Sequence, residues 1–93
     1  MEEGKKVRGR DRERIFYDIL CAILIQESNG IARITRVQNA VNLPWDRFRN
    51  HLETMAELGL VKRSDSLKST AKGREFVSEY KKVIRVLKRF GLD

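Results

Sequence analysis

Apolar residues recur at helical spacing over the first third of the chain. They occupy Ile15, Phe16, Ile19, Leu20, Ile23 and Leu24. This spacing predicts an α-helix, with Asp11 as its N-cap and Ser28-Asn29-Gly30 marking its end. Tyr17, Cys21 and Ile25 add a second apolar face. A helix that is apolar on two faces is expected to be covered on two sides, by its own core and by a further helix or partner.

Two shorter helices are predicted in the middle of the chain. Residues 31–34 have weak β character, and Thr35 can then cap a helix from 36 to about 41. A tight turn at 42–44 follows, because Pro44 fits the first turn of the next helix. Gly59 supplies the left-handed residue that ends this third helix. The expected core face of the third helix holds Phe48, Leu52, Met55 and Ala56.

The last third combines two short strands with a long helix. Residues 60–63 and 67–70 flank a polar turn, which predicts a small hairpin. Thr70 can cap the final helix, whose apolar residues follow a spacing of 4, 3, 4 and 3. That spacing is typical of a coiled-coil seam. The seam consists of Phe76, Tyr80, Val83, Leu87 and Phe90.

The order of these elements predicts a mainly α fold with a small β-hairpin. Two helices joined by a short turn and followed by a hairpin form a winged helix-turn-helix. We expect a mobile tail of mixed charge over residues 1–10, the winged domain over 11–70, and a dimerisation helix over 71–93. In such folds the second helix of the pair lies in the major groove of DNA, and the hairpin, or wing, reaches the backbone.

The composition excludes several classes of function. The chain of 93 residues carries 20 Lys and Arg against 13 Asp and Glu, a net charge of +7, which favours an anionic partner. One His and one Cys leave few ways to build an acid–base or metal site, so we expect no enzyme, no metal and no cofactor. The charged N-terminus lacks a secretory signal, and no apolar run is long enough to span a bilayer. A cytoplasmic protein without membrane contact is expected.

Four short motifs resemble the small archaeal winged-helix DNA-binding proteins. They are Thr35-Arg36-Val37, the stretch 40–43, Leu52-x-x-Met55 with Gly59-Leu60-Val61, and Thr70-x-x-Gly73-Arg74-Glu75-Phe76. Together they cover about half of the chain. This family includes transcriptional regulators and chromatin-associated proteins, so the resemblance implies binding to double-stranded DNA. The chain departs from the family at Pro44, where a Ser or Thr cap is usual, and in its shorter final helix.

Candidate DNA contacts lie on three elements. On the third helix, Arg47 and Arg49 can pair with guanine and Asn50 with adenine, although a solvated charged face is the ordinary alternative. Trp45 either covers the core or touches the DNA backbone. The remaining candidates are backbone contacts at Arg33 and Arg36, beside the second helix, and at Lys62, Arg63 and Lys68, on the hairpin.

The final helix is expected to join two copies of the chain. A helix of about 28 Å would overhang a single winged domain, which favours a homodimer over an internal core stripe. The favoured function is a homodimeric transcriptional regulator, associated with the nucleoid and without a visible small-molecule effector. The alternatives are an architectural chromatin protein and, from a different class, a winged-helix adaptor that binds proteins. RNA binding is less favoured, because no aromatic stacking platform is visible.

Overall fold

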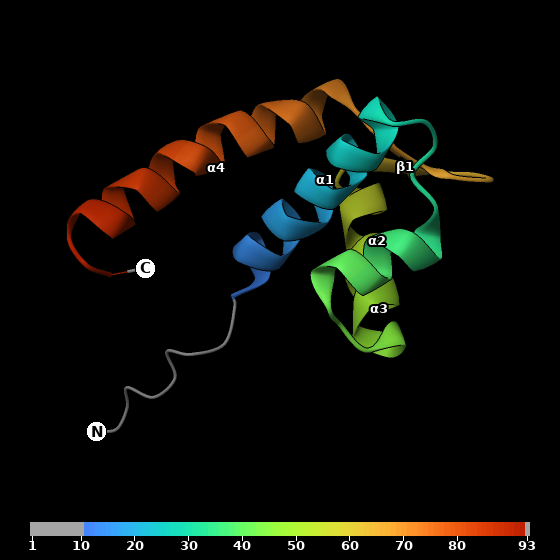
Figure 1. Cartoon of the computed structure of the whole chain (residues 1–93), viewed down its shortest axis with the longest axis horizontal. Helices are drawn as coiled ribbons and strands as arrows, with labels where there is room; N and C mark the ends of the chain where they lie inside the picture. Colours follow the sequence, from blue (N-terminus) through green and yellow to red (C-terminus); the bar gives the residue numbers. More distant parts are fainter. Residues whose placement is uncertain (1–10, 93) are drawn as a thin grey trace.

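The computed structural model describes residues 11–92, which form four helices and one two-stranded hairpin (Figure 1). The elements are α1 (Arg12–Ser28), α2 (Ile34–Val41), α3 (Trp45–Glu57), β1 (Val61–Arg63), β2 (Leu67–Ser69) and α4 (Ala71–Arg89). This is the predicted mainly α fold with a small antiparallel hairpin and a C-terminal helix. The tail expected over residues 1–10 lies outside the described residues.

Most of the predicted helix ends are confirmed by their hydrogen bonds. The Asp11 carboxylate accepts from the backbone N–H of Arg14 at 2.8 Å, and the Thr70 hydroxyl accepts from the N–H of Gly73 at 2.9 Å. Each bond satisfies a donor that the first turn of a helix leaves free. Gly59 has a φ of 80°, so it ends α3 in the left-handed conformation as predicted.

The predicted start of α2 is wrong. The helix begins at Ile34 with Arg33 in the N-cap position, and no side chain caps it. Thr35 therefore lies inside the first turn. The reason is tertiary: Ala32 pairs with Leu67, whose N–H donates to the Ala32 carbonyl at 2.9 Å. This bridge holds the chain extended up to residue 33 and lets the helix begin directly after it.

Pro44 also lies one position earlier than predicted. It occupies the N-cap of α3, and Trp45 is the first helical residue. The turn before it is made by Asn42, which has a φ of 58°. Asparagine tolerates this left-handed conformation better than most residues do. The two helices are thus joined by a tight connection, as the helix-turn-helix motif requires.

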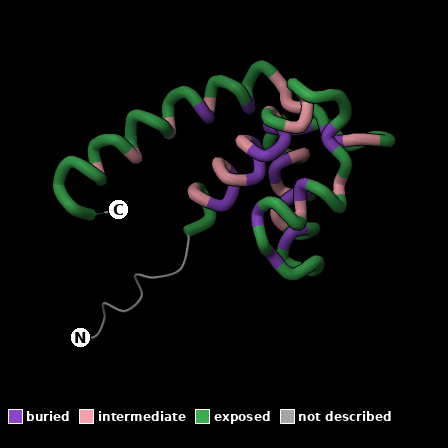
Figure 2. The backbone as a smooth tube through the Cα atoms, viewed as in Figure 1, coloured by how far each residue is buried: buried purple, intermediate pink, exposed green. Residues whose placement is uncertain are grey.

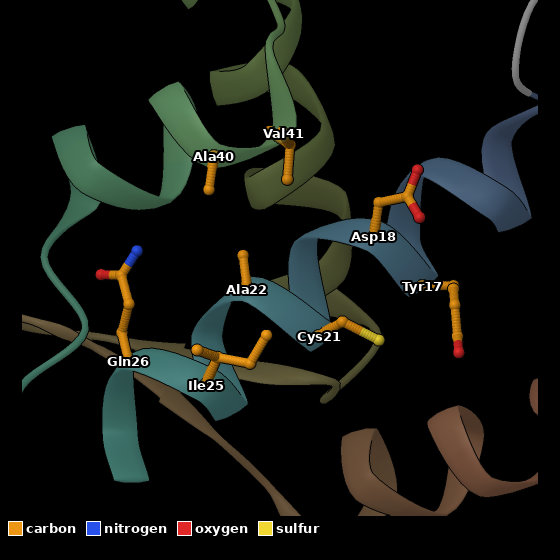
Figure 3. A pocket seen from close by; sticks show the side chains of 8 residues that line it. All are labelled: Tyr17, Asp18, Cys21, Ala22, Ile25, Gln26, Ala40 and Val41. Carbon is orange, nitrogen blue, oxygen red and sulfur yellow. The ribbon is translucent and has the colours of Figure 1, made fainter. Parts of the chain in front are cut away.

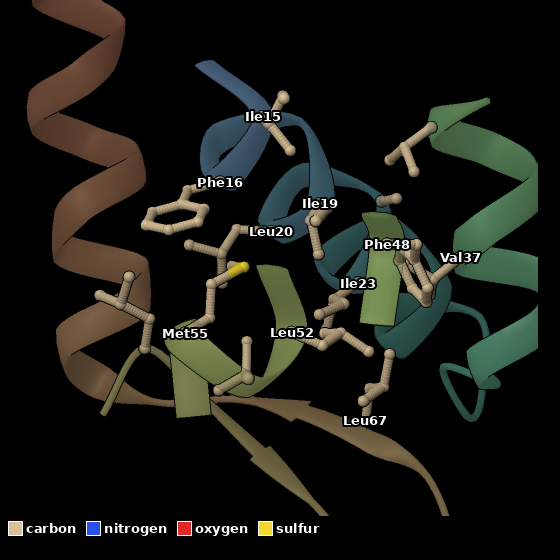
Figure 4. Packing of buried hydrophobic residues seen from close by; sticks show 14 of the residues in the cluster. Ile15, Phe16, Ile19, Leu20, Ile23, Val37, Phe48, Leu52, Met55 and Leu67 are labelled. Carbon is tan, nitrogen blue, oxygen red and sulfur yellow. The ribbon is translucent and has the colours of Figure 1, made fainter. Parts of the chain in front are cut away.

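The hydrophobic core is built around α1, which packs against α2, α3 and α4. Figure 4 shows Ile19, Leu20 and Ile23 of α1 facing the buried side chains of α3, together with Leu67 from the hairpin. The buried side chains of α3 are Phe48, Leu52 and Met55. Apolar burial on this scale is the main favourable term in folding, so α1 is the central element of the domain.

Only the first part of α4 belongs to this core. Gly73 and Val77 are its only buried residues, and the far part of the helix, which is mostly exposed, extends beyond the body (Figure 2). Gly73 lies directly against the backbone of Leu60, because a Cβ at residue 73 would collide with the Leu60 carbonyl oxygen. The start of α4 is therefore fixed against the core, whereas its far end makes no core contacts.

Candidate nucleic-acid interface

The outer face of α3 presents polar side chains because its inner face is fully used by the core. Phe48 and Leu52 are buried, while Arg47, Arg49 and Asn50 are exposed. Arg47 and Arg49 lie on the two flanks of the helix, on either side of the buried Phe48, and Asn50 lies on its outermost side. The structure gives them no ion pair with another described residue. They are free to contact a ligand.

Trp45 lies at the start of α3 and serves partly as a cover for the core. Its ring centroid is 6.0 Å from that of Phe48, yet 43% of the residue stays exposed. Trp45 can therefore both cover the core and touch the DNA backbone, since one side of the indole packs on Phe48 and the rest faces solvent. An indole can combine an apolar contact with a hydrogen bond from its N–H.

Arg33 and Arg36 are brought together at the start of α2. Both are exposed, and both line a surface cavity of about 460 Å³ together with Asn29 and Gly30. The N-cap of α2 has no side-chain hydrogen bond, so N–H groups of its first turn point outward. Donors of this kind, flanked by guanidinium groups, are typical contacts to phosphate.

The hairpin separates its three predicted cations. Lys62 lies directly opposite Lys68 in the antiparallel register, while Arg63 pairs with Leu67. Side chains alternate between faces along a strand, so the two lysines share one face and Arg63 lies on the other. Like charges directly opposite each other are destabilising. The pair of lysines therefore concentrates positive charge on one face of the hairpin.

The base of the hairpin is held by a residue that sequence reasoning did not identify. The Glu27 carboxylate accepts from the Ser69 hydroxyl at 2.8 Å and from the Ser69 N–H at 3.0 Å. Arg74 also donates to the Ser69 hydroxyl, at 2.9 Å. Glu27 and Ser69 are 42 residues apart, so no local pattern could have linked them. These bonds fix the hairpin relative to α1, and thereby relative to α3.

The seam predicted on α4 divides into two parts. Phe76 and Tyr80 pack within the chain: their rings stack at 5.5 Å, and Tyr80 lies 5.2 Å from the ring of Tyr17 on α1. Leu87 is half-buried. Val83 is 46% exposed and Phe90 is 66% exposed. The first part of the seam is thus used inside the molecule, and the second part leaves apolar surface exposed.

A cavity of about 330 Å³ borders the second apolar face of α1. Tyr17, Cys21 and Ile25 line it from α1, and Ala40 and Val41 from α2 (Figure 3). Burial raises the pKa of the Cys21 thiol and, likewise, the pKa of Tyr17. Both groups therefore stay protonated at neutral pH, and a protonated thiol is a poor nucleophile.

Two kinds of feature are absent from residues 11–92. No cluster of three or more His, Cys, Asp or Glu side chains in this range is placed to hold a metal ion. None of its helices combines the length and the apolar character that a membrane span requires.

Comparison with known proteins agrees with this geometry. The sequence profile of a winged helix-turn-helix family matches residues 10–88, which is most of the chain, and the protein belongs to this family. Families with this fold are typically DNA-binding proteins rather than enzymes. No curated protein and no solved structure matches the chain.

Proposed function

We propose that the protein binds double-stranded DNA with α3 in the major groove and the hairpin on the backbone. The observation that carries the proposal is α3, on which Arg47, Arg49 and Asn50 are exposed on the flanks and outermost side of a helix whose inner face is buried. Arginine can read guanine and asparagine can read adenine through paired hydrogen bonds. Arg33, Arg36, Trp45 and the hairpin cations then supply backbone contacts that set the register.

The favoured role is that of a homodimeric transcriptional regulator in the cytoplasm, associated with the nucleoid. Two features of the molecule support this role. Side chains that can read bases are exposed on α3, and an apolar segment is exposed on α4. Operators bound by such dimers have two half-sites about one helical turn apart. The archaeal proteins that its motifs resemble include regulators of this kind.

An architectural role is the second candidate, because the net charge of +7 supports binding that is largely independent of sequence. A regulator binds discrete operators, whereas an architectural protein coats DNA with weak selectivity. Competition between random DNA and the upstream region of the protein's own gene, across a series of salt concentrations, separates the two roles. A protein-interaction adaptor, the third candidate, would show no salt-dependent affinity for duplex DNA.

Replacing Arg47 and Arg49 together with Ala tests the interface. We expect duplex affinity to fall by about 1–3 kcal/mol for each arginine that reads a base, with an unchanged circular dichroism spectrum, because both side chains are exposed. Lys82→Ala with Arg89→Ala removes the same charge from the outer face of α4 and serves as the control. Equal affinities of the two double variants would contradict the assignment of α3 as the recognition helix.

A further inference from the structure

The positive charges of α4 are concentrated on one side of the helix. Positions 74, 78, 81, 85 and 88 follow a spacing of 4, 3, 4 and 3, so they share one face. All five residues are exposed and none is acidic. We call this set the basic flank: Arg74, Ser78, Lys81, Arg85 and Lys88. The neighbouring outer face, at positions 75, 79, 82, 86 and 89, instead mixes both signs, and Lys82 pairs with Glu79 at 3.2 Å.

The basic flank borders an open hollow on the surface. Lys81, Arg85 and Lys88 line a space of about 190 Å³ together with Ile84 and Tyr17 of α1. No ion pair with another described residue neutralises these three cations. Three cations around a small space, with no carboxylate in the lining, match the chemistry of a phosphate oxyanion.

We propose that the basic flank is a second phosphate-binding surface, which contacts the backbone of duplex DNA beyond the segment held by α3 and the hairpin. The inference rests on the proposed DNA binding. Arg74 already donates to Ser69, so the cations of the flank that remain are Lys81, Arg85 and Lys88. They span about 10 Å along the helix, and one DNA strand presents a phosphate about every 3.4 Å along its axis. A duplex backbone can therefore supply several phosphates to a row of cations of this length, which a single free anion cannot.

The position of the flank separates it from the recognition surface. α1 packs against α2 and α3 on one side and against α4 on another, and the far end of α4 lies at the end of the molecule opposite the hairpin (Figure 1). The protein is 45 Å long, which corresponds to about 13 base pairs. Contact with the flank thus needs either a longer duplex or a second one.

A homodimer would leave the flank accessible. The flank and the seam that begins at Phe76 have the same spacing but are offset by two residues, which places them about 200° apart around the helix. A second copy seated on Val83 and Phe90 therefore covers the opposite side of α4. Dimerisation and phosphate binding can occur on the same helix.

The test compares two variants of matched composition. Arg85→Gln with Lys88→Gln removes one arginine and one lysine from the flank. Lys82→Gln with Arg89→Gln removes the same pair from the outer face, and both variants lack one cation of the last turn of α4. On a duplex of about 40 base pairs, we expect the flank variant to bind about tenfold more weakly at 0.1 M salt, and its salt slope to fall by about two units. The control variant should change less than twofold.

Two assays identify the source of the phosphate. If the flank contacts the same duplex, the weaker binding appears at about 40 base pairs and disappears at about 12. If it contacts a second duplex, bead-bound DNA captures less labelled DNA through the flank variant than through the control. The proposal is overturned if both variants behave alike in both assays. Wild-type protein that binds no duplex at all would instead overturn the proposed function itself.

Discussion

Gly73 is the residue at which the final helix is joined to the winged body. An added Cβ would collide with the backbone carbonyl oxygen of Leu60 and approach a methyl group of Leu20 to 3.0 Å. The carbonyl belongs to the chain between α3 and β1, and Leu20 lies in the fully buried core. Neither neighbour can move without disturbing other contacts, because protein interiors are close-packed.

We therefore expect Gly73→Ala to destabilise the protein, although alanine is the better helix former by about 1 kcal/mol. Overpacking typically costs about 1–3 kcal/mol, and the contact here is with rigid backbone. The free energy of unfolding, measured in urea, should fall by about the 1–3 kcal/mol that overpacking costs.

Ser78→Ala, at an exposed position of the same helix, should stay within about 0.5 kcal/mol of the wild type. A Gly73→Ala protein as stable as the wild type would show that α4 can shift away from Leu60.

Among the elements, the hairpin depends most on the rest of the fold. Each of its strands has three residues, and an isolated two-stranded hairpin is marginally stable at best. Its shape is maintained by the two hydrogen bonds that Ser69 donates to Glu27 and by the bridge between Ala32 and Leu67. The opposed Lys62 and Lys68 add a small repulsion between like charges.

Replacing Lys62, Arg63 and Lys68 together with Ala should lower DNA affinity equally on all sequences, because backbone contacts carry no sequence information. The slope of log K against log salt should fall by about one unit for each phosphate that the hairpin no longer neutralises. Gel shifts on two unrelated duplexes over a salt series measure both effects. An unchanged slope would remove the hairpin from the interface.

The elements were largely predictable from the sequence because their signals are local. The apolar spacing of α1, the caps at Asp11 and Thr70 and the left-handed Gly59 each act within a few residues. The predictions that are wrong depend on distant contacts. Thr35 fails as a cap because Leu67 holds Ala32 extended.

In the candidate site, too, the features that depend on neighbouring residues could be predicted from the sequence, and those that depend on distant contacts could not. The exposed face of α3 follows from its helical period, and so does the exposure of Arg47 and Asn50. The hydrogen bonds that Ser69 donates to Glu27 join residues far apart in the chain. The packing of Tyr80 on Tyr17 likewise could not be read from the spacing on α4, because a seam looks alike whether a neighbouring helix or a second copy covers it.

At the scale of the whole molecule, the proposed dimer explains why α4 extends beyond its own core. Val83→Glu with Phe90→Lys places charges on the exposed part of the seam. Both residues are exposed in the single chain, so the fold should persist. Full burial of each across a dimer would contribute about 1.5–3 kcal/mol, and the variant should therefore be monomeric and bind DNA much more weakly.

Sedimentation equilibrium at tens of micromolar decides this prediction. Wild-type protein should run as a dimer of the 10.9-kDa chain and the variant as a monomer. Glu75→Lys with Lys82→Glu, which exchanges charges on the outer face of α4, should leave the dimer intact. A monomeric wild type would mean that the seam serves only the chain's own fold.

The close contact at Gly73 gives α4 the properties of a lever with a fixed pivot. From Gly73 to Arg89 the helix is about 24 Å long, so a tilt of about 10° at the pivot moves the far end by about 4 Å. That displacement exceeds the rise of about 3.4 Å between successive base pairs. If two copies join through the ends of α4, the angle at this one glycine determines the distance between the two recognition helices, and with it the number of base pairs between the half-sites that the protein accepts.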